Sequence, residues 1–437
     1  TNTVITSFEE GKSPEGNQLL GEAYFMRALM HLNLVTLYAK PYSHGRDNIG
    51  VPLHISTSNP APFRAKVGDV YDQIVKDLTK ASELMGASRG NAGYPSKDAA
   101  LGLLSRVHLY MENWQEVVNT VNTMLAGADP TSKLATDLNA LFPNAKTEGE
   151  TLFCIAHETT DTRGQSSIGS MYLKDGLGWG EIYPSNTLLY LYERYPEDVR
   201  YSKIIIPQYL ESGAITAYLP IEAQEGGIST GRTNLVTSAT KDGENYTCTA
   251  NGTKYTLEKR TINGEYTEYW MNYEGEDLQV RVHPAINNRK QIPMYYINKF
   301  SYQDGDPMLS SPIVCRWGEV ILNRAEAYAH MGGKDAEALA DVNVIRERAG
   351  IPAEGLFATG KMHGYKTVLD VVLDERRLEL AFEGFRTHDL TRNKINIDRQ
   401  YPGAHPWQVV PYNHNHLIYP IPNNEWTVSG IQQNDGY

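Results

Sequence analysis

The chain has 437 residues, of which 41% are apolar and 21% charged, so it can bury the core of one large domain or two closely joined domains. Its 40 basic and 52 acidic side chains give a net charge of −12 without a dense basic run, which argues against nucleic acid as a partner. Three scattered cysteines form no CxxC motif, so neither a zinc ribbon nor a disulfide framework is expected. The 28 tyrosines outnumber the 9 phenylalanines, and many of their rings should lie where a hydroxyl meets water.

Helices are expected at the start of the chain. Over residues 21–38 apolar side chains recur every three or four positions, the spacing of a buried helical face. A second, amphipathic stripe covers 70–85. The next two helices, 97–111 and 113–125, have almost no loop between them, so they must pack antiparallel as a helical hairpin.

A second helical hairpin is expected towards the C-terminus, at 316–331 and 338–349, with small residues where the two helices would cross. Pairs of this kind resemble tetratricopeptide units. A last helix at 367–382 precedes an irregular, proline-rich tail. The expected fold class is therefore mainly α: a tetratricopeptide-like helical-hairpin scaffold with a large loop-rich insertion.

The insertion, 131–312, loses the helical period and accumulates Gly, Pro, Asn, Thr and Tyr. Within it, Asn251-Gly252 and Asn263-Gly264 each separate two alternating segments. Asn-Gly between such segments is the strongest short-range signal for a β-hairpin. We therefore predict a small three-stranded antiparallel meander at about 245–273.

The pairing in this meander follows from two-residue turns. Tyr246 would lie opposite Leu257, and Leu257 opposite Trp270, with Cys248 facing Tyr255. Because side chains alternate along a strand, these five share the apolar side of the sheet. Tyr269 then falls on the opposite side, which faces water.

Charged and aromatic residues alternate closely in the segment 374–392. Arg376, Glu379 and Glu383 lie three and four residues apart, so one helical face carries ionisable groups that need partners from neighbouring helices. A buried structural ion network is the first interpretation of this segment. A catalytic or anion-binding cluster is the alternative.

Catalytic signatures are few. The sequence has no GxSxG elbow, HExxH motif or P-loop. His405, His414 and His416 could offer metal ligands, but surface histidines are the simpler interpretation, because no third ligand at suitable spacing is evident. Asp304-Gly305-Asp306 is read as a plain turn, since the further ligands of a calcium loop are missing. No metal and no cofactor are expected.

Four segments together resemble the SusD/RagB family, the outer-membrane nutrient-binding lipoproteins of Bacteroidetes. The helix from Gly21 to Tyr38 looks like the first helix of that family, and Trp317 to Tyr328 like a later one. Glu375-Arg376-Arg377 through Glu383-Gly384-Phe385-Arg386 and Asp389-Leu390 resembles its "ER…E…EG.R..DL" segment. The closing Pro420-Ile421-Pro422 with Gln433-Asn434-Asp435-Gly436-Tyr437 is similar to its "PIP…QNPGY" tail.

The resemblance implies a non-catalytic protein that captures oligosaccharides at the cell surface and delivers them to a SusC-like TonB-dependent transporter. It implies a helical scaffold in two parts, 1–130 and 313–437, around the ligand-binding region 131–312. It also implies attachment to the outer membrane through an N-terminal lipid anchor, which is inferred because only twenty residues precede the Gly21 helix. The matching motifs belong to the scaffold and carry over no ligand contacts.

Candidate ligand contacts follow instead from the chemistry of sugars. A sugar ring offers an apolar face and a rim of hydroxyls, so its binder needs exposed aromatic planes beside amide, carboxylate or guanidinium groups. Trp179, between two glycines in a loop, is the first candidate, followed by Tyr183 and Asn186. The meander supplies the others: Tyr269, Trp270 and Tyr273.

Two other functions stay open from the sequence. A glycoside hydrolase needs only two carboxylates about 5–10 Å apart, and such a spatial pair is invisible in a sequence. A tetratricopeptide-type scaffold would bind peptides or proteins in an open concave groove. Whether the cargo is a glycan or a peptide is likewise open.

Overall fold

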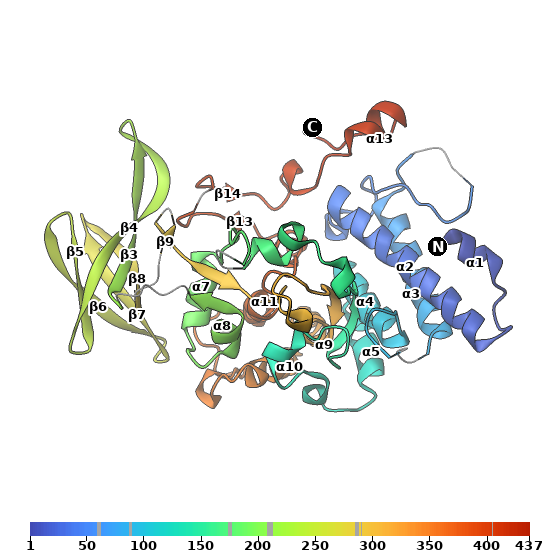
Figure 1. Ribbon diagram of the computed structural model, residues 1–437, viewed down its shortest axis with the longest axis horizontal. Coiled ribbons are helices and arrows are strands. Elements are labelled where there is room, and N and C mark those ends of the chain that lie inside the picture. Colours follow the sequence, from blue (N-terminus) through green and yellow to red (C-terminus); the bar gives the residue numbers. More distant parts are fainter. Residues whose placement is uncertain are drawn as a thin grey trace.

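The structure is a computed structural model that describes residues 1–58, 63–86, 90–173, 177–207, 213–284, 288–289, 291–403 and 405–437. Helices gather in one part of the molecule and a β-barrel forms the other (Figure 1). The helical part is built from α1 (Asn2–Ser7), α2 (Pro14–Tyr38), α3 (Val67–Leu84), α4 (Lys97–Tyr110), α5 (Trp114–Leu125), α9 (Trp317–His330), α10 (Asp335–Arg348), α11 (Val368–Glu379) and α12 (Arg386–Arg392).

The predicted helices are confirmed, with small shifts at their ends. The first long helix starts earlier than its apolar stripe suggests, because the side chain of Ser13 accepts a hydrogen bond from the amide of Gly16 and Pro14 occupies the first turn. The helical hairpins α4–α5 and α9–α10 both form. No described helix is both long enough and apolar enough to span a bilayer.

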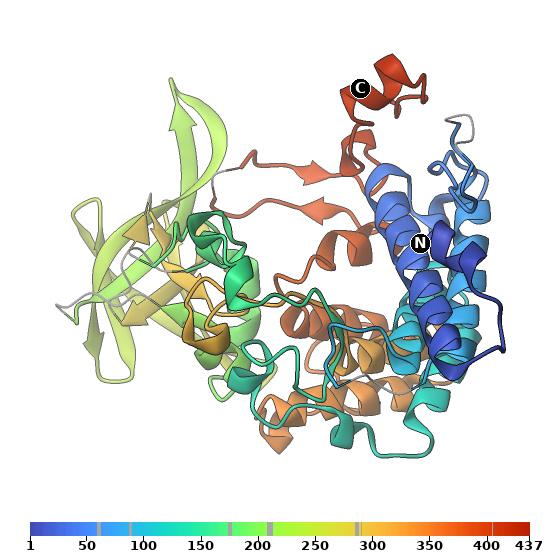
Figure 2. The same cartoon turned by 45° about the vertical axis from the view of Figure 1, so that its right-hand side comes forward.

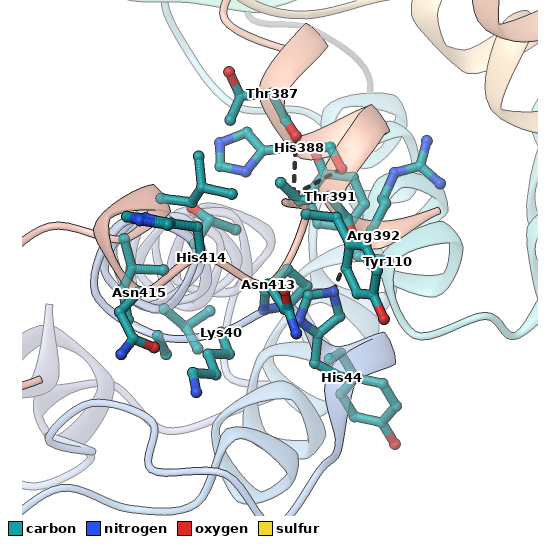
Figure 3. A pocket seen from close by; sticks show the side chains of 18 of the residues that line it. Lys40, His44, Tyr110, Thr387, His388, Thr391, Arg392, Asn413, His414 and Asn415 are labelled. Carbon is teal, nitrogen blue, oxygen red and sulfur yellow. Dashed lines mark hydrogen bonds between the residues drawn. The ribbon is translucent and has the colours of Figure 1, made fainter. Parts of the chain in front are cut away.

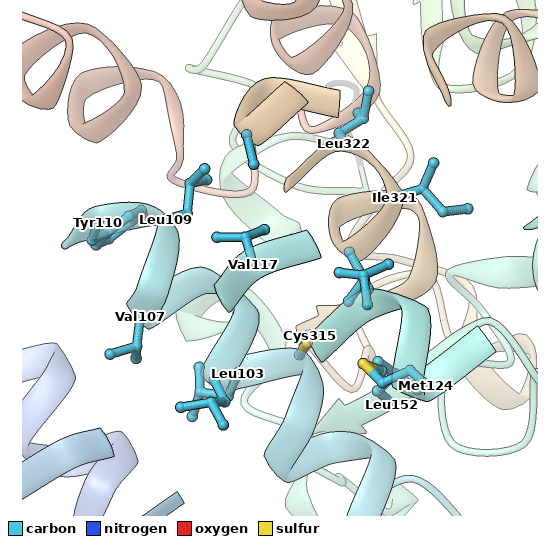
Figure 4. Close-up of a cluster of buried hydrophobic side chains, with 14 of the residues drawn as sticks. Leu103, Val107, Leu109, Tyr110, Val117, Met124, Leu152, Cys315, Ile321 and Leu322 are labelled. Carbon is cyan, nitrogen blue, oxygen red and sulfur yellow. The ribbon is translucent and has the colours of Figure 1, made fainter. Parts of the chain in front are cut away.

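The helical core joins segments that are far apart in the sequence. Leu103 of α4 and Ile321 of α9 are fully buried in one cluster with Cys315 (Figure 4). At Gly102 a methyl group would come within 2.9 Å of the Cys315 sulfur, so the absence of a side chain lets α4 pack closely against this layer. The N-terminal and C-terminal helices therefore form one frame.

The middle of the chain leaves this frame and returns to it at adjacent points. Strand β1 (Thr151–Cys154) pairs antiparallel with β12 (Ile313–Arg316), directly before α9. Between them lie, besides the barrel, α6 (Leu138–Leu141), α7 (Asn186–Glu193), α8 (Val199–Lys203), β2 (Ile205–Pro207), β9 (Asn288–Arg289), β10 (Ile292–Pro293) and β11 (Tyr295–Ile297). After α12 follow β13 (Ile397–Asp398), β14 (Val409–Val410) and α13 (Asn423–Val428).

The small meander was a wrong prediction, because its strands belong to a closed antiparallel barrel of six. The order around the barrel is β3-β4-β5-β6-β7-β8, and β8 closes onto β3. The strands are β3 (Ile215–Glu225), β4 (Ile228–Asp242), β5 (Asn245–Ala250), β6 (Thr253–Ile262), β7 (Tyr266–Tyr273) and β8 (Glu276–Pro284). Closure removes the exposed edges that an isolated meander would present.

Half of the predicted register is confirmed. Tyr246 lies opposite Leu257, and Cys248 opposite Tyr255, as a two-residue turn at Asn251-Gly252 requires. The second turn has three residues, because Ile262 pairs with Tyr266. The pairing therefore slips by one residue, and Trp270 lies opposite Glu258.

This slip exchanges the faces of two candidate residues. Trp270, expected on the apolar side, lies on the outside of the barrel. Tyr269, expected on the wet side, packs against the interior cluster, and its ring centroid is 5.0 Å from that of Tyr246. Tyr273 is also interior, is 6% exposed, and accepts a hydrogen bond from Asn251 Nδ2 at 2.6 Å.

The charged segment 374–392 forms the buried ion network that was the first interpretation. Glu379 accepts hydrogen bonds from Arg316 at 2.6 Å and Arg200 at 3.2 Å, and it also contacts Arg348. Burial alone would raise the pKa of Glu379, but these three guanidinium groups hold it well below its ordinary value. The network ties β12, α8, α10 and α11 together.

Candidate functional site

The first candidate residue, Trp179, lies exposed on a fixed loop. Its side chain is 53% exposed, and its Nε1 donates a hydrogen bond to the Gln165 carbonyl at 3.0 Å. A methyl group on Gly178 would lie 2.5 Å from the Ser170 carbonyl oxygen, so the loop packs tightly against its support. The ring is presented to solvent as expected, but nothing else in the described residues builds a ring-lined hollow around it.

The two residues predicted to accompany Trp179 point elsewhere. Tyr183 is half-buried, and its hydroxyl lies in the interior without a hydrogen-bond partner among the residues that the structure describes. Asn186 is 5% exposed, and its Oδ1 accepts a hydrogen bond from Arg281 at 3.1 Å. Asn186 is therefore a support for the barrel and is not itself exposed to a ligand.

Arg281 lines a groove between α7 and the outer side of β7 and β8, which we name the barrel groove. It is an open groove whose free space, including solvent at its open side, is about 660 Å³. Three tyrosine rings line it, two from the helical side and one from the barrel: Tyr190, Tyr201 and Tyr266. Polar side chains lie between the rings: Glu193, Arg194, Glu268, Gln279, Arg281 and His283.

Trp270 lies at the rim of the barrel groove. It pairs across the strands with Gln279, which lines the groove. Its Nε1 donates to Glu268 Oε2 at 2.9 Å, and the Arg260 guanidinium lies 4.8 Å from its ring centroid. These contacts orient the indole, and they keep a carboxylate and an amide next to an aromatic plane. Of the six sequence candidates, Tyr269 also lines this groove, although its ring packs inward.

The floor of the barrel groove is a rigid polar network. Glu193 accepts hydrogen bonds from Arg281 and from the Tyr201 hydroxyl, the latter at 3.2 Å. The Tyr295 hydroxyl lies 3.2 Å from His283 Nδ1. Burial, reinforced by the Arg281 charge, lowers the pKa of His283 well below its ordinary value, so this imidazole is neutral at pH 7. A floor fixed in this way needs little reordering when a ligand binds.

Sequence reasoning missed most of the barrel groove. Tyr190 belongs to α7, a short helix inside a segment that the sequence marks only as loop-rich. Gln279 lies on β8, whose alternation of Leu278, Val280 and Val282 with polar residues was the available signal. Even if α7 and β8 had both been predicted, the sequence would not have shown that they pack next to each other.

A second pocket opens where α2 ends beside α12. Figure 3 shows His388, Asn413 and His414 around it, with His44 next to Thr391. The His44 ring nitrogen lies 2.8 Å from the Thr391 carbonyl oxygen, so this histidine ties the segment after α2 to α12.

The histidines considered as metal ligands do not form a cluster. The rings of His414 and His416 are 5.1 Å apart, while His405 packs against Tyr401. Within the residues that the structure describes, no group of three or more His, Cys, Asp or Glu side chains could hold a metal ion.

Comparisons with known proteins identify the family to which the chain belongs. Residues 149–437 match the SusD family, and residues 1–109 match a family described as "Starch-binding associating with outer membrane". The chain belongs to the SusD family.

Individual relatives agree with this assignment. SusD-like protein P2 of Formosa agariphila is 25% identical over all of this chain and 77% of its own length. SusD-like protein P38 of the same organism is 23% identical over 88% of this chain and 68% of its own length.

Solved structures show the same fold. A SusD superfamily protein from Bacteroides vulgatus aligns over 100% of this chain and 81% of its own, with a TM-score of 0.68 and 23% identity. A SusD-like carbohydrate binding protein from the same species covers 98% of this chain and 80% of its own, with a TM-score of 0.62 and 17% identity.

Proposed function

We propose that this protein is a glycan-binding protein of the bacterial cell surface that holds oligosaccharides without cleaving them. The observation that carries the proposal is the barrel groove, where tyrosine rings and the rim residue Trp270 lie beside Glu268 and Gln279. Rings can stack on the apolar faces of sugars, and the carboxylate and amide can bind their hydroxyls. Membership of the SusD family and the carbohydrate-binding name of one structural relative support the same function.

The carboxylates of the barrel groove suit binding better than hydrolysis. Glu193 accepts hydrogen bonds from Arg281 and Tyr201, and Glu268 accepts one from Trp270. A general acid in a glycosidase must be free to donate a proton to the leaving group. Glu193 Oε1 is instead engaged as an acceptor by the Arg281 guanidinium group and the Tyr201 hydroxyl. We therefore propose that the protein is not an enzyme.

Delivery is the second half of the proposal. In the family that the sequence resembles, such proteins cap a SusC-like TonB-dependent transporter and are lipid-anchored to the outer membrane. The description of the family that matches residues 1–109 supports association with that membrane. We propose the same partner, the same anchor and the same cell-surface location for this protein.

Electrophoresis of the purified chain through native gels that contain neutral polysaccharides tests the binding function. We expect at least one polysaccharide to retard the chain, with an affinity in the millimolar to micromolar range, about −4 to −8 kcal/mol. A parallel assay for new reducing ends should stay at the level of the buffer. Release of reducing ends would show a hydrolase, and mobility unchanged by every polysaccharide would refute glycan binding.

A further inference from the structure

Another groove shares no lining residue with the barrel groove. It lies between the start of α7, the turn from α11 to α12, and the segment 395–401, and its free space, including solvent at its open side, is about 1670 Å³. The hairpin of β13 and β14 runs from the helical part towards the barrel beside it (Figure 2). Beyond that hairpin Trp407 packs on Gly231 of β4, which anchors this side of the groove to the barrel. We name it the arginine groove, after Arg377 and Arg386, which line it.

Arg377 differs from the arginines of the buried network. Among the described residues, its guanidinium donates hydrogen bonds only to the hydroxyls of Ser185, at 3.4 Å, and Thr187. No carboxylate of the described residues lies within ion-pair distance of it. Its neighbour Arg376, by contrast, is paired with Asp389 at 3.0 Å. Arg377 thus keeps hydrogen-bond donors that no acceptor in the described part of the chain uses.

The surroundings of Arg377 add positive rather than negative charge. Burial and, to a smaller extent, the nearby Arg386 lower the pKa of Arg377 to about 10, although Asp374 acts in the opposite direction. The two hydroxyls that it contacts stand at the start of α7, where the helix dipole is positive. Asp374 lies 3.9 Å from Arg386 and also accepts a hydrogen bond from Tyr365 at 2.8 Å. Its carboxylate is therefore shared between these two side chains.

The acidic side chain of Asp398 does not neutralise the charge of Arg377. Asp398 lines the groove, but it is exposed and accepts a hydrogen bond from the Gln400 amide at 2.7 Å. A positive spot therefore remains on the groove wall of a protein whose net charge is −12. Tyr172 and Tyr401 add aromatic rings to the same groove.

We propose that the arginine groove binds an acidic saccharide, with Arg377 holding a carboxylate or sulfate group on a sugar ring and Arg386 adding to its attraction. A guanidinium group matches the two oxygens of either anion with parallel N–H donors. Tyr172 and Tyr401 are placed to contact the sugar rings on either side of the charged group. This inference rests on the proposed glycan-binding function and extends its ligands to uronic acids and sulfated sugars.

Calorimetric titration with matched ligands tests the inference. The probes are a trimer of galacturonic acid, its fully methyl-esterified form, a sulfated galactan oligosaccharide and sodium sulfate. We expect the wild-type chain to bind at least one of the two acidic saccharides about tenfold more tightly than the esterified trimer. Arg377→Gln should abolish this preference, Arg386→Gln should reduce it, and Arg377→Lys should keep part of it, because the charge remains.

Two controls separate charge and folding from the site itself. Lys241→Gln removes one positive charge from an exposed position of β4, outside the groove lining, and it should leave the preference unchanged. The unfolding temperature of each variant shows whether it is folded. If Arg377→Gln does not fold, the inference is tested by the ligand preference of the wild-type chain and by its reduction in Arg386→Gln.

Each outcome has a distinct meaning. Equal affinity of the wild-type chain for acidic and esterified saccharides, or a preference that survives Arg377→Gln, would overturn the inference while neutral glycan binding in gels still stands. Binding of sulfate ion alone, as tight as that of the sulfated saccharide, would also overturn it, since only an ion site would remain. If no saccharide of any kind binds, the proposed function fails as well.

Discussion

Replacing Glu379 by alanine should lower the free energy of unfolding by about 3–5 kcal/mol, as expected when one partner leaves a buried ion network. Glu379 is 2% exposed and touches three arginines from three different segments, Arg200, Arg316 and Arg348. Its removal leaves these guanidinium groups with fewer acceptors inside the protein. Urea unfolding of the purified chain, followed by circular dichroism, measures the loss.

A matched control lies one helix away. Glu347 of α10 is exposed, and its replacement by alanine should change stability by less than about 0.5 kcal/mol. A loss of less than about 1 kcal/mol in Glu379→Ala would mean that the network does not hold the frame together.

Acidification should destabilise the folded chain in two stages. Burial lowers the pKa of five histidines: His31, His44, His108, His283 and His388. As the pH falls below about 6.5, the unfolded chain takes up protons that these folded-state histidines bind less readily, so stability decreases.

The second stage comes from carboxylates. Burial alone would raise the pKa values of Glu326, Glu379 and Glu383, but the cations around them lower all three. Below about pH 4.3 the unfolded chain takes up protons that these groups resist, and the stability that they contribute is lost. Urea unfolding at intervals from pH 7.5 to 3.5 follows both stages. A free energy of unfolding that stays constant or rises as the pH drops would contradict the assigned pKa shifts.

The helical frame was predictable because each of its helices carries a periodic apolar face. The stripe of α3, with Val70, Ile74 and Leu78, is buried as its spacing requires. The spacing of charges at the end of α11 and just after it likewise predicts an ion network, since Arg376, Glu379 and Glu383 recur at helical spacing and need partners from neighbouring helices.

The barrel was harder to predict from the sequence, because one turn has an unexpected length and because closure depends on a long-range strand pair. The local reason is the turn after β6, where one additional residue, Glu265, moves Trp270 from the inside to the outside. The distant reason is closure, because β8 must pair with β3 some sixty residues earlier, as Ala217 with Val282, and no local pattern encodes that contact. Alternation alone therefore found strands but not a barrel.

The candidate site was predictable in kind and not in place. We expected an exposed indole ring beside amide, carboxylate or guanidinium groups. Trp179 has the exposed ring but not these neighbouring groups among the described residues. The site that we propose combines Trp270 with the neighbouring groove between α7 and the barrel, elements that lie about 80 residues apart in the sequence. Such a site depends on tertiary packing, which composition and spacing do not specify.

Titration of the chain with an oligosaccharide from a polysaccharide that retards it, compared with Trp270→Ala, tests the account most directly. We predict a loss of affinity of about 10- to 100-fold, since truncating an aromatic side chain that stacks on the ligand costs about 1–3 kcal/mol. Trp426→Ala, which removes an exposed indole from α13, is the matched control and should bind as the wild type does. Unchanged affinity in Trp270→Ala, with a loss in Trp179→Ala instead, would move the site to the loop and contradict the assignment to the barrel groove.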